Sequence, residues 1–126
     1  MKLRIRKNSL RLRVSPSELA RLIETGRIEE TIHFTAESDA RLTYALEHAE
    51  AQAELSVRYR PQEVTVVVST GEARKWAEGE QVGIYGDVGA EGCRLVLAVE
   101  KDFACLDGSD RDNQDRFANP RKGTKC

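Results

Sequence analysis

The chain has 126 residues, 40% of them hydrophobic and 33% charged, which is enough for one ordinary domain with its own core. No apolar run approaches membrane-spanning length, and residues 1–4 alternate charged and apolar side chains instead of opening a secretory signal. Three cysteines without a short-spaced pair argue against a disulfide framework. These features predict a soluble, cytoplasmic protein that does not act on a membrane.

The net charge of −1 conceals an asymmetry along the chain. The first thirteen residues include six basic and no acidic side chains, so the remaining residues together carry −7. The sequence therefore predicts a basic end and an acidic body.

The first half reads as two strands, a helix and two further strands. Residues 2–14 alternate apolar and basic side chains around a polar turn, which predicts a hairpin with one apolar and one basic face. Ser15 and Glu18 can form a capping box around Pro16, so a helix is predicted to begin at Pro16 and to end before Gly26. Residues 28–34 and 42–46 then predict a second hairpin.

The second half repeats this plan. Residues 3–28 align with residues 57–82 without a gap, and the basic strand positions and both capping serines recur. The identical pairs are Arg4/Arg58, Arg6/Arg60, Val14/Val68, Ser15/Ser69, Glu18/Glu72 and Glu24/Glu78. A second helix is therefore predicted to begin at Thr70, and such a repeat indicates a pseudo-symmetric fold.

The apolar pattern continues beyond this alignment. Val82, Ile84 and Val88 are predicted to correspond to Ile28, Ile32 and Phe34. Leu95, Leu97 and Val99 match the last strand of the first half after a one-residue slip. The spacing of the aromatic residues Trp76, Tyr59 and Tyr85 predicts that all three belong to the core.

We therefore predict a mostly β (α+β) fold, in which two duplicated ββαββ units form a swapped-hairpin-type β-barrel with two short helices. Interleaving the hairpins of the two units would remove the open sheet edges that each unit has alone. The predicted organisation is a single fused domain with a first repeat at 1–48, a linker at 49–54, a second repeat at 55–101 and a C-terminal tail at 102–126.

Residues 4–14, followed by a capped helix, resemble the opening of the MazE-type antitoxins and of the wider SpoVT/AbrB family of swapped-hairpin barrels. The resemblance covers about twenty-five residues. It implies a barrel normally closed by two chains, which binds DNA through its N-terminal hairpin and often offers a C-terminal tail to a toxin. By position, Arg4 and Arg13 match the family's DNA-facing residues, and Asn8 and Ser9 match its turn. The chain then looks like a fused pseudo-dimer.

The whole chain also resembles a family of short uncharacterised bacterial proteins. The shared features are the basic opening and a Glu-Lys-Asp-Phe-x-Cys-Leu segment, seen here at residues 100–106. This resemblance implies no known activity.

The basic hairpins are the first candidate site, for DNA or another anion. Cations on alternate strand positions recur about every 6.6 to 6.8 Å, a spacing that can follow a nucleic-acid backbone. The candidate residues are Arg4, Arg6, Lys7, Arg11, Arg13, Arg58 and Arg60. Alternatively, these arginines pair with carboxylates of neighbouring strands, such as Glu29, Glu30, Glu47 or Glu54.

Catalytic and metal sites have weaker support. Cys105 and Cys126 could bind zinc with nearby acids or histidines, but no short Cys or His spacing supports such a site. His33 and His48 lie in no catalytic motif. A small enzyme or a metal-binding protein remains an alternative, and we expect no cofactor.

The C-terminal tail is the last candidate binding site. Phe103 and Phe117 flank a polar segment and predict an arm pinned at two points, against the barrel or in a groove of another protein. Taken together, the sequence predicts a non-enzymatic binding module, a monomer or weak homodimer, that contacts a protein partner. The alternative is a DNA-binding or antitoxin-like regulator that uses the basic hairpin.

Overall fold

The computed structural model describes residues 1–103 and residue 117. Within them the chain forms two successive ββαββ segments, as predicted. The first consists of β1 (Lys2–Arg6), β2 (Ser9–Val14), α1 (Pro16–Thr25), β3 (Arg27–His33) and β4 (Arg41–Ala49). The second consists of β5 (Leu55–Arg60), β6 (Glu63–Ser69), α2 (Thr70–Glu78), β7 (Gly83–Ala90) and β8 (Cys93–Lys101).

Both helices begin where the capping residues predicted. At α1 the Ser15 hydroxyl accepts from the Glu18 amide and the Glu18 carboxylate accepts from the Ser15 amide, so the capping box is complete. At α2 the Ser69 hydroxyl accepts from the Glu72 amide. Gly26 ends α1 with φ +88°, a left-handed conformation that glycine adopts without strain.

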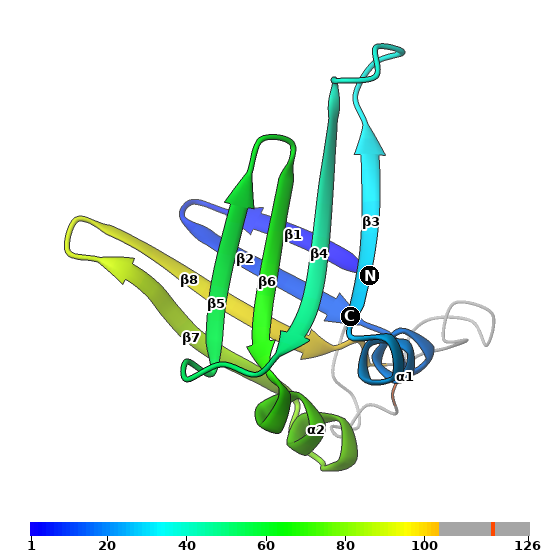
Figure 1. The fold of residues 1–126 in the computed structure, drawn as a ribbon, viewed down its shortest axis with the longest axis vertical. Helices are drawn as coiled ribbons and strands as arrows, with labels where there is room; N and C mark the ends of the chain where they lie inside the picture. The colour runs from blue at the N-terminus through cyan, green and yellow to red at the C-terminus, as the bar shows by residue number, and fades with distance from the viewer. Residues whose placement is uncertain (104–116, 118–126) are drawn as a thin grey trace, which may run out of the picture.

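The hairpins are exchanged between the two halves of the chain. Sheet A has the strand order β1-β2-β8-β7, and sheet B has the order β3-β4-β6-β5. Each sheet therefore combines the first hairpin of one half with the second hairpin of the other, joined through a parallel pair of inner strands. Figure 1 shows the two sheets crossing steeply, one behind the other, with both helices at one end.

The sheets do not close into a barrel, which corrects that part of the prediction. Each has four strands, with β1 and β7 as the edges of sheet A and β3 and β5 as the edges of sheet B. Because the strands cross steeply, the sheets overlap only at their centres, and the tips of the β3–β4 and β7–β8 hairpins extend beyond the body as two arms (Figure 1). The edge strands β5 and β7 approach each other at one corner, where Gly86 faces the Leu55 side chain, but no backbone ladder joins the two sheets within the described residues.

The core lies between the inner faces of the two sheets and is closed at one end by the helices. Its fully buried members come from strands of both sheets and from both helices: Leu12, Val14, Leu97 and Val99 from sheet A, Leu46 and Val68 from sheet B, and Leu22, Ala73 and Trp76 from the helices. Neither described helix has the length and apolar content needed to cross a membrane.

The prediction was right for Trp76, which is fully buried, and wrong for Tyr59 and Tyr85. Tyr59 is 75% exposed because it lies on the inner face of sheet B at the far end of β5, beyond the overlap with sheet A. Tyr85 is 56% exposed because it alternates with the buried Ile84 and therefore points out of sheet A.

The strand pairings define which positions of the two halves correspond. Ser9 pairs with Val96, and its counterpart Glu63 pairs with Thr43. Thr43 and Val96 are therefore equivalent, which agrees with the one-residue slip expected from the apolar pattern.

The predicted counterparts of Ile28 and Ile32 were wrong. Ile32 pairs with Leu42 and Val88 pairs with Leu95, so Ile32 corresponds to Val88 and not to Ile84. Ile28 pairs with Leu46 and Ile84 pairs with Val99, so Ile28 corresponds to Ile84. Both are buried, whereas Val82 is 41% exposed. The cause is the longer connection in the second half: α2 ends four residues before β7, whereas only Gly26 separates α1 from β3.

Candidate anion-binding interface

The β1–β2 hairpin presents a dense row of cations on the outer face of sheet A. Arg4 lies directly opposite Arg11, and Lys2 opposite Arg13, so these side chains share one face, while Leu3 and Leu12 face the core. Lys7 lies in the connecting turn with φ +50°. The turn is fixed to β8, because the Val96 amide donates to the Asn8 carbonyl at 3.1 Å.

We call the outward positions of sheet A the basic face. They hold six basic and two acidic residues, a net charge of +4 in a protein whose net charge is −1. The residues are Lys2, Arg4, Arg6, Arg11, Arg13 and Arg94, with Asp87 and Glu100.

Only part of this charge is neutralised locally. Arg11 and Arg13 both direct Nε to one oxygen of Glu100, at 3.2 and 3.5 Å. Lys2 pairs with Asp102 at 2.9 Å, and Arg94 pairs with Asp87 at 3.1 Å. Within the described residues, Arg4, Arg6 and Lys7 form no ion pair.

Two adjoining depressions lie between these side chains. The larger, about 160 Å³, is lined by Lys2, Leu3, Arg4, Arg11 and Arg13. The smaller, about 70 Å³, is lined by Arg4, Arg6, Ser9 and Arg11. Because Arg4 and Arg11 line both, the depressions form one shallow, positively charged track along the hairpin, suited to an anionic ligand that lies along the surface.

Tyr85 and Val96 add apolar surface to the basic face. Val96 is 52% exposed, and the Tyr85 hydroxyl donates to Glu100 Oε2 at 2.7 Å. Partial burial and this hydrogen bond raise the pKa of Tyr85 to about 12, so its hydroxyl remains a donor at neutral pH. The sequence analysis missed Tyr85 and Glu100 as parts of this surface, although the parity of Tyr85 against Ile84 was a usable signal.

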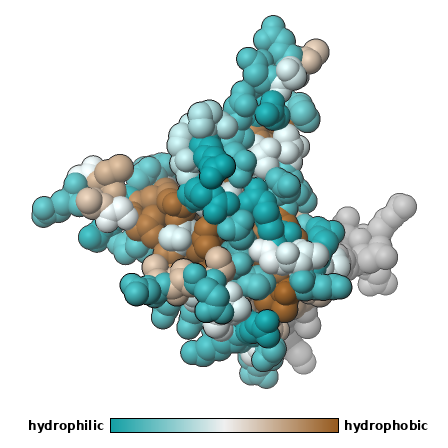
Figure 2. All heavy atoms as spheres, in the orientation of Figure 1, coloured by the Kyte–Doolittle hydropathy of each residue, from teal (hydrophilic) through white to brown (hydrophobic). Residues whose placement is uncertain are grey.

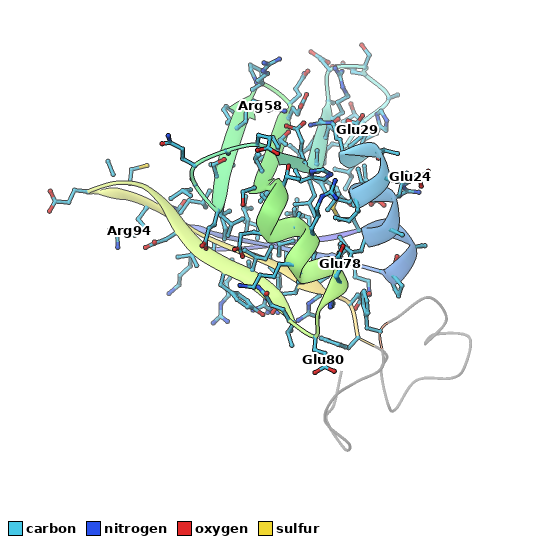
Figure 3. The ribbon with its side chains drawn as sticks, turned by 60° about the horizontal axis from the view of Figure 1, so that its bottom comes forward. Glu24, Glu29, Arg58, Glu78, Glu80 and Arg94 are labelled. Atoms are coloured by element: carbon cyan, nitrogen blue, oxygen red, sulfur yellow. The ribbon has the colours of Figure 1, made fainter. Side chains whose placement is uncertain are left out.

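The remaining two candidate cations lie elsewhere. Arg58 and Arg60 are on β5, so they belong to the outer face of sheet B, which we call the paired face. Figure 3 shows Arg58 and Glu29 on the sheet B side of the body, and Arg94 away from both, on the β7–β8 hairpin. The structure therefore brings five of the seven candidates together and separates Arg58 and Arg60 from them.

The paired face is neutralised by a connected ion-pair network. Glu47 accepts from both terminal nitrogens of Arg58, at 3.1 and 3.2 Å, and from Arg27 at 3.2 Å. Arg27 also pairs with Glu29 at 3.4 Å and with Glu63 at 2.9 Å. The hydrogen bonds from Arg58 and Arg27 hold the pKa of Glu47 below its usual range, against the raising effect of its burial. On this side Arg58 pairs with a carboxylate of a neighbouring strand, as the alternative interpretation expected, whereas Arg60 forms no ion pair within the described residues.

The residues considered for catalysis and metal binding do not converge in the part of the chain that the structure describes. His48 of β4 contacts both helices through its ring nitrogens. Its Nδ1 lies 3.1 Å from the Thr70 hydroxyl of α2, and its Nε2 lies 3.4 Å from the Ile23 carbonyl oxygen of α1. His33 is exposed on β3. Among the described residues, no group of three His, Cys, Asp or Glu could hold a metal ion. Cys105 and Cys126 lie outside the described residues.

The two aromatic residues of the tail contact each other and the body. The Phe103 and Phe117 rings meet edge to face with centroids 5.9 Å apart, and the Phe117 amide donates to the Asp102 carbonyl at 2.8 Å. Phe117 packs against the hydrophobic core, and the Lys101 ammonium lies 5.4 Å from its ring centroid. The acidic segment between these two residues lies outside the described part of the chain.

Comparison with known proteins assigns the chain to a family without assigning it an activity. Residues 1–121 match the model of a family of unknown function, DUF7009, so the chain belongs to that family. No curated protein and no solved structure matches the chain.

Proposed function

We propose that this member of the family is a non-enzymatic binding module and that its basic face holds the phosphate backbone of a nucleic acid. The observation that carries the proposal is the group of Arg4, Arg6 and Lys7, three neighbouring cations without ion-pair partners among the described residues. Free cations clustered on a sheet of net charge +4 attract a polyanion, and phosphates displace their counterions on binding.

The accessibility of the face supports the same proposal. Both helices lie at one end of the two sheets, so no described helix covers the outer side of sheet A (Figure 1). The two depressions between Arg4, Arg6 and Arg11 run along the β1–β2 hairpin and follow its cations. An extended anionic ligand can therefore contact several of them at once.

The exchanged hairpins are consistent with the resemblance to the SpoVT/AbrB barrels, and we include that relationship in the proposal. In a fused pseudo-dimer the two halves are free to diverge. Here the equivalents of Lys2, Arg11 and Arg13 are Ser56, Thr65 and Val67, so the equivalent hairpin of the second half keeps two of the five strand cations. A palindromic duplex requires two equal faces. We therefore propose a contact through one face only.

The proposal is tested by a salt titration of binding. A labelled mixed-sequence DNA is titrated with the wild type and with two double variants, Arg4→Ala/Arg6→Ala on the basic face and Arg58→Ala/Arg60→Ala at the equivalent positions of the paired face. We expect the first variant to lose about 10-fold in affinity at 50 mM salt and to have a shallower salt dependence, with the slope reduced by about 2. The second variant should stay within about 2-fold of the wild type. Equal losses in both variants, or no binding by the wild type at low salt, would contradict the proposal.

The second candidate is a protein partner, and the exposed apolar residues favour it. Ile32, Phe34 and Tyr59 are exposed on strand ends and hairpin tips, and Figure 2 shows hydrophobic atoms gathered where β5 meets the β7–β8 hairpin. An acidic polypeptide could also use the basic face. Poly-L-glutamate in the same titration separates these cases: binding as tight as that of DNA, and equally dependent on Arg4 and Arg6, would favour a protein partner.

A further inference from the structure

We infer that the basic face binds single-stranded nucleic acid in preference to duplex, with a base stacked on the ring of Tyr85. This inference rests on the proposed function and names its ligand class. It depends on how Tyr85 is held, on what lies beside its ring, and on where the unpaired cations lie relative to it.

The ring of Tyr85 is fixed along the surface of the sheet. Gly83 is two residues earlier on the same strand and faces the same way, and a Cβ atom at that position would lie 2.9 Å from the Tyr85 hydroxyl oxygen. The absence of a side chain at Gly83 therefore allows the tyrosine to lie along β7. The hydrogen bond to Glu100 holds the far end of the side chain at 2.7 Å, while the residue remains 56% exposed. An exposed ring that is already ordered loses little entropy when a ligand stacks on it.

An apolar shelf lies beside this ring. Ala98 of β8 is directly opposite Tyr85, and Val96 is the next outward residue of the same strand. The side chains at both positions are short, which leaves room for a flat group beside Tyr85, and the Arg11 Nε lies beyond them at 3.2 Å from Glu100. The shelf separates Tyr85 from the β1–β2 hairpin by the width of one strand.

Arg11 and Arg4 lie in the same cross-strand row as Tyr85 and Ala98. Arg11 pairs in register with Ala98, and Arg4 pairs with Arg11, so Tyr85, Ala98, Arg11 and Arg4 cross the face in order. Neighbouring strands are about 4.8 Å apart, which places the Arg4 backbone about 14 Å from that of Tyr85. A chain with a base on Tyr85 and successive phosphates toward Arg4 and Arg6 would span this row.

This arrangement distinguishes single strands from duplexes. Proteins that bind single strands combine a positively charged track with aromatic rings on which bases stack. In a duplex the base faces are already stacked on one another, so a duplex can use the cations of the basic face but not the ring of Tyr85. The paired face lacks the aromatic ring, because Glu29 occupies the position equivalent to Tyr85 and Arg27 the position equivalent to Gly83.

The test compares a labelled twelve-nucleotide oligo(dT) with a labelled twelve-base-pair duplex at 50 mM salt, by fluorescence anisotropy. We expect Tyr85→Ala to weaken oligo(dT) binding about 10-fold and to leave duplex binding within about 2-fold. Tyr85→Phe keeps the ring and should stay within about 2-fold for both ligands. Tyr59→Ala removes an exposed tyrosine outside the basic face and serves as the matched control, with no change expected.

The outcomes separate this inference from the proposed function. If DNA binding depends on Arg4 and Arg6 but Tyr85→Ala affects neither ligand, or affects both equally, the inference is wrong and the proposed function stands. If neither ligand binds the wild type at low salt, both are wrong. The variant Tyr85→Trp gives an independent readout that does not depend on removing the ring. We expect the tryptophan fluorescence at this position to be quenched by oligo(dT) and unchanged by the duplex. The absence of quenching at saturating oligo(dT) would also overturn the inference.

Discussion

The basic face and the paired face occupy equivalent positions in the two sheets but differ in how their charges are balanced. Each is centred on one glutamate, Glu100 in sheet A and Glu47 in sheet B, and the strand pairings make these two residues equivalent. Glu47 receives a two-pronged contact from Arg58 and a further bond from Arg27. Glu100 receives single Nε contacts from Arg11 and Arg13.

The difference arises from a few substitutions on a common framework. The paired face has four basic and three acidic outward residues, a net charge of +1, against +4 on the basic face. The changes in charge from sheet A to sheet B are Lys2 to Ser56, Ser9 to Glu63, Arg11 to Thr65, Arg13 to Val67, Gly83 to Arg27, Tyr85 to Glu29 and Asp87 to Thr31. The same backbone thus supports a closed network on one side and an open cationic surface on the other. This difference underlies our proposal that the basic face binds a ligand, whereas the ion pairs of the paired face contribute to the stability of the fold.

The largest expected effect is on stability, from removing the two central carboxylates. We expect Glu47→Gln to cost about 1 kcal/mol, because it weakens the charge-assisted bond from Arg27, whose side chain is only 27% exposed. The melting temperature should fall by about 4–8 °C. Glu100→Gln should cost less than about 0.5 kcal/mol, because Arg11 and Arg13 each make a single contact to one oxygen, at 3.2 and 3.5 Å, and both arginines are well exposed, so water can replace these contacts. Thermal unfolding of both variants checks the comparison, which fails if Glu100→Gln is the more destabilising.

The same pair of variants should have the opposite order of effects on binding. Glu100→Gln removes the carboxylate that neutralises Arg11 and Arg13, while the new amide oxygen can still accept from the Tyr85 hydroxyl. We expect the affinity for oligo(dT) to rise about 3-fold and its salt dependence to steepen. Glu47→Gln should leave the affinity unchanged. An equal increase in both variants would mean that only the overall charge of the protein matters, and not the face that carries it.

The smallest expected effect is on the acid side of the stability profile. Hydrogen bonds from Arg58 and Arg27 lower the pKa of Glu47 in the folded protein, so its contribution is fully present above the ordinary value of 4.5 and is lost as the pH falls through the folded pKa. The difference in melting temperature between the wild type and Glu47→Gln should therefore narrow as the pH falls below about 4.5. Melting curves at pH 7, 5, 4 and 3 measure it. A difference that stays constant with pH would assign the destabilisation to packing instead of charge.

Local signals in the sequence predicted the elements and their order. Apolar alternation located the strands, and Ser15 and Ser69 located the starts of both helices, because capping and alternation depend on residues close together in the chain. The position of the basic hairpin and the shared face of Arg4, Arg6, Arg11 and Arg13 followed from the same two-residue period.

Contacts between residues far apart in the chain could not be predicted from these local signals. The carboxylate that pairs with Arg11 and Arg13 is Glu100, on a strand from the other end of the chain, whereas the sequence suggested nearer acids. The counterpart of Ile28 was displaced because the connection after α2 is longer than that after α1. The barrel was predicted closed because open edges are unfavourable, and nothing in one strand specifies the angle at which two sheets cross.

The sequence by itself determined that this protein is a duplicated, mostly β domain with a basic N-terminal hairpin, because periodicity, capping and repetition act over a few residues. Only the tertiary structure decided that the two outer faces differ in how their charges are balanced. That difference depends on the parallel pairing of β2 with β8 and of β4 with β6, which brings Glu100 beside Arg11 and Arg13 and gathers Arg27, Arg58 and Glu63 around Glu47. Because charge balance depends on distances of a few ångströms between residues far apart in the chain, it becomes visible only once the hairpins are exchanged.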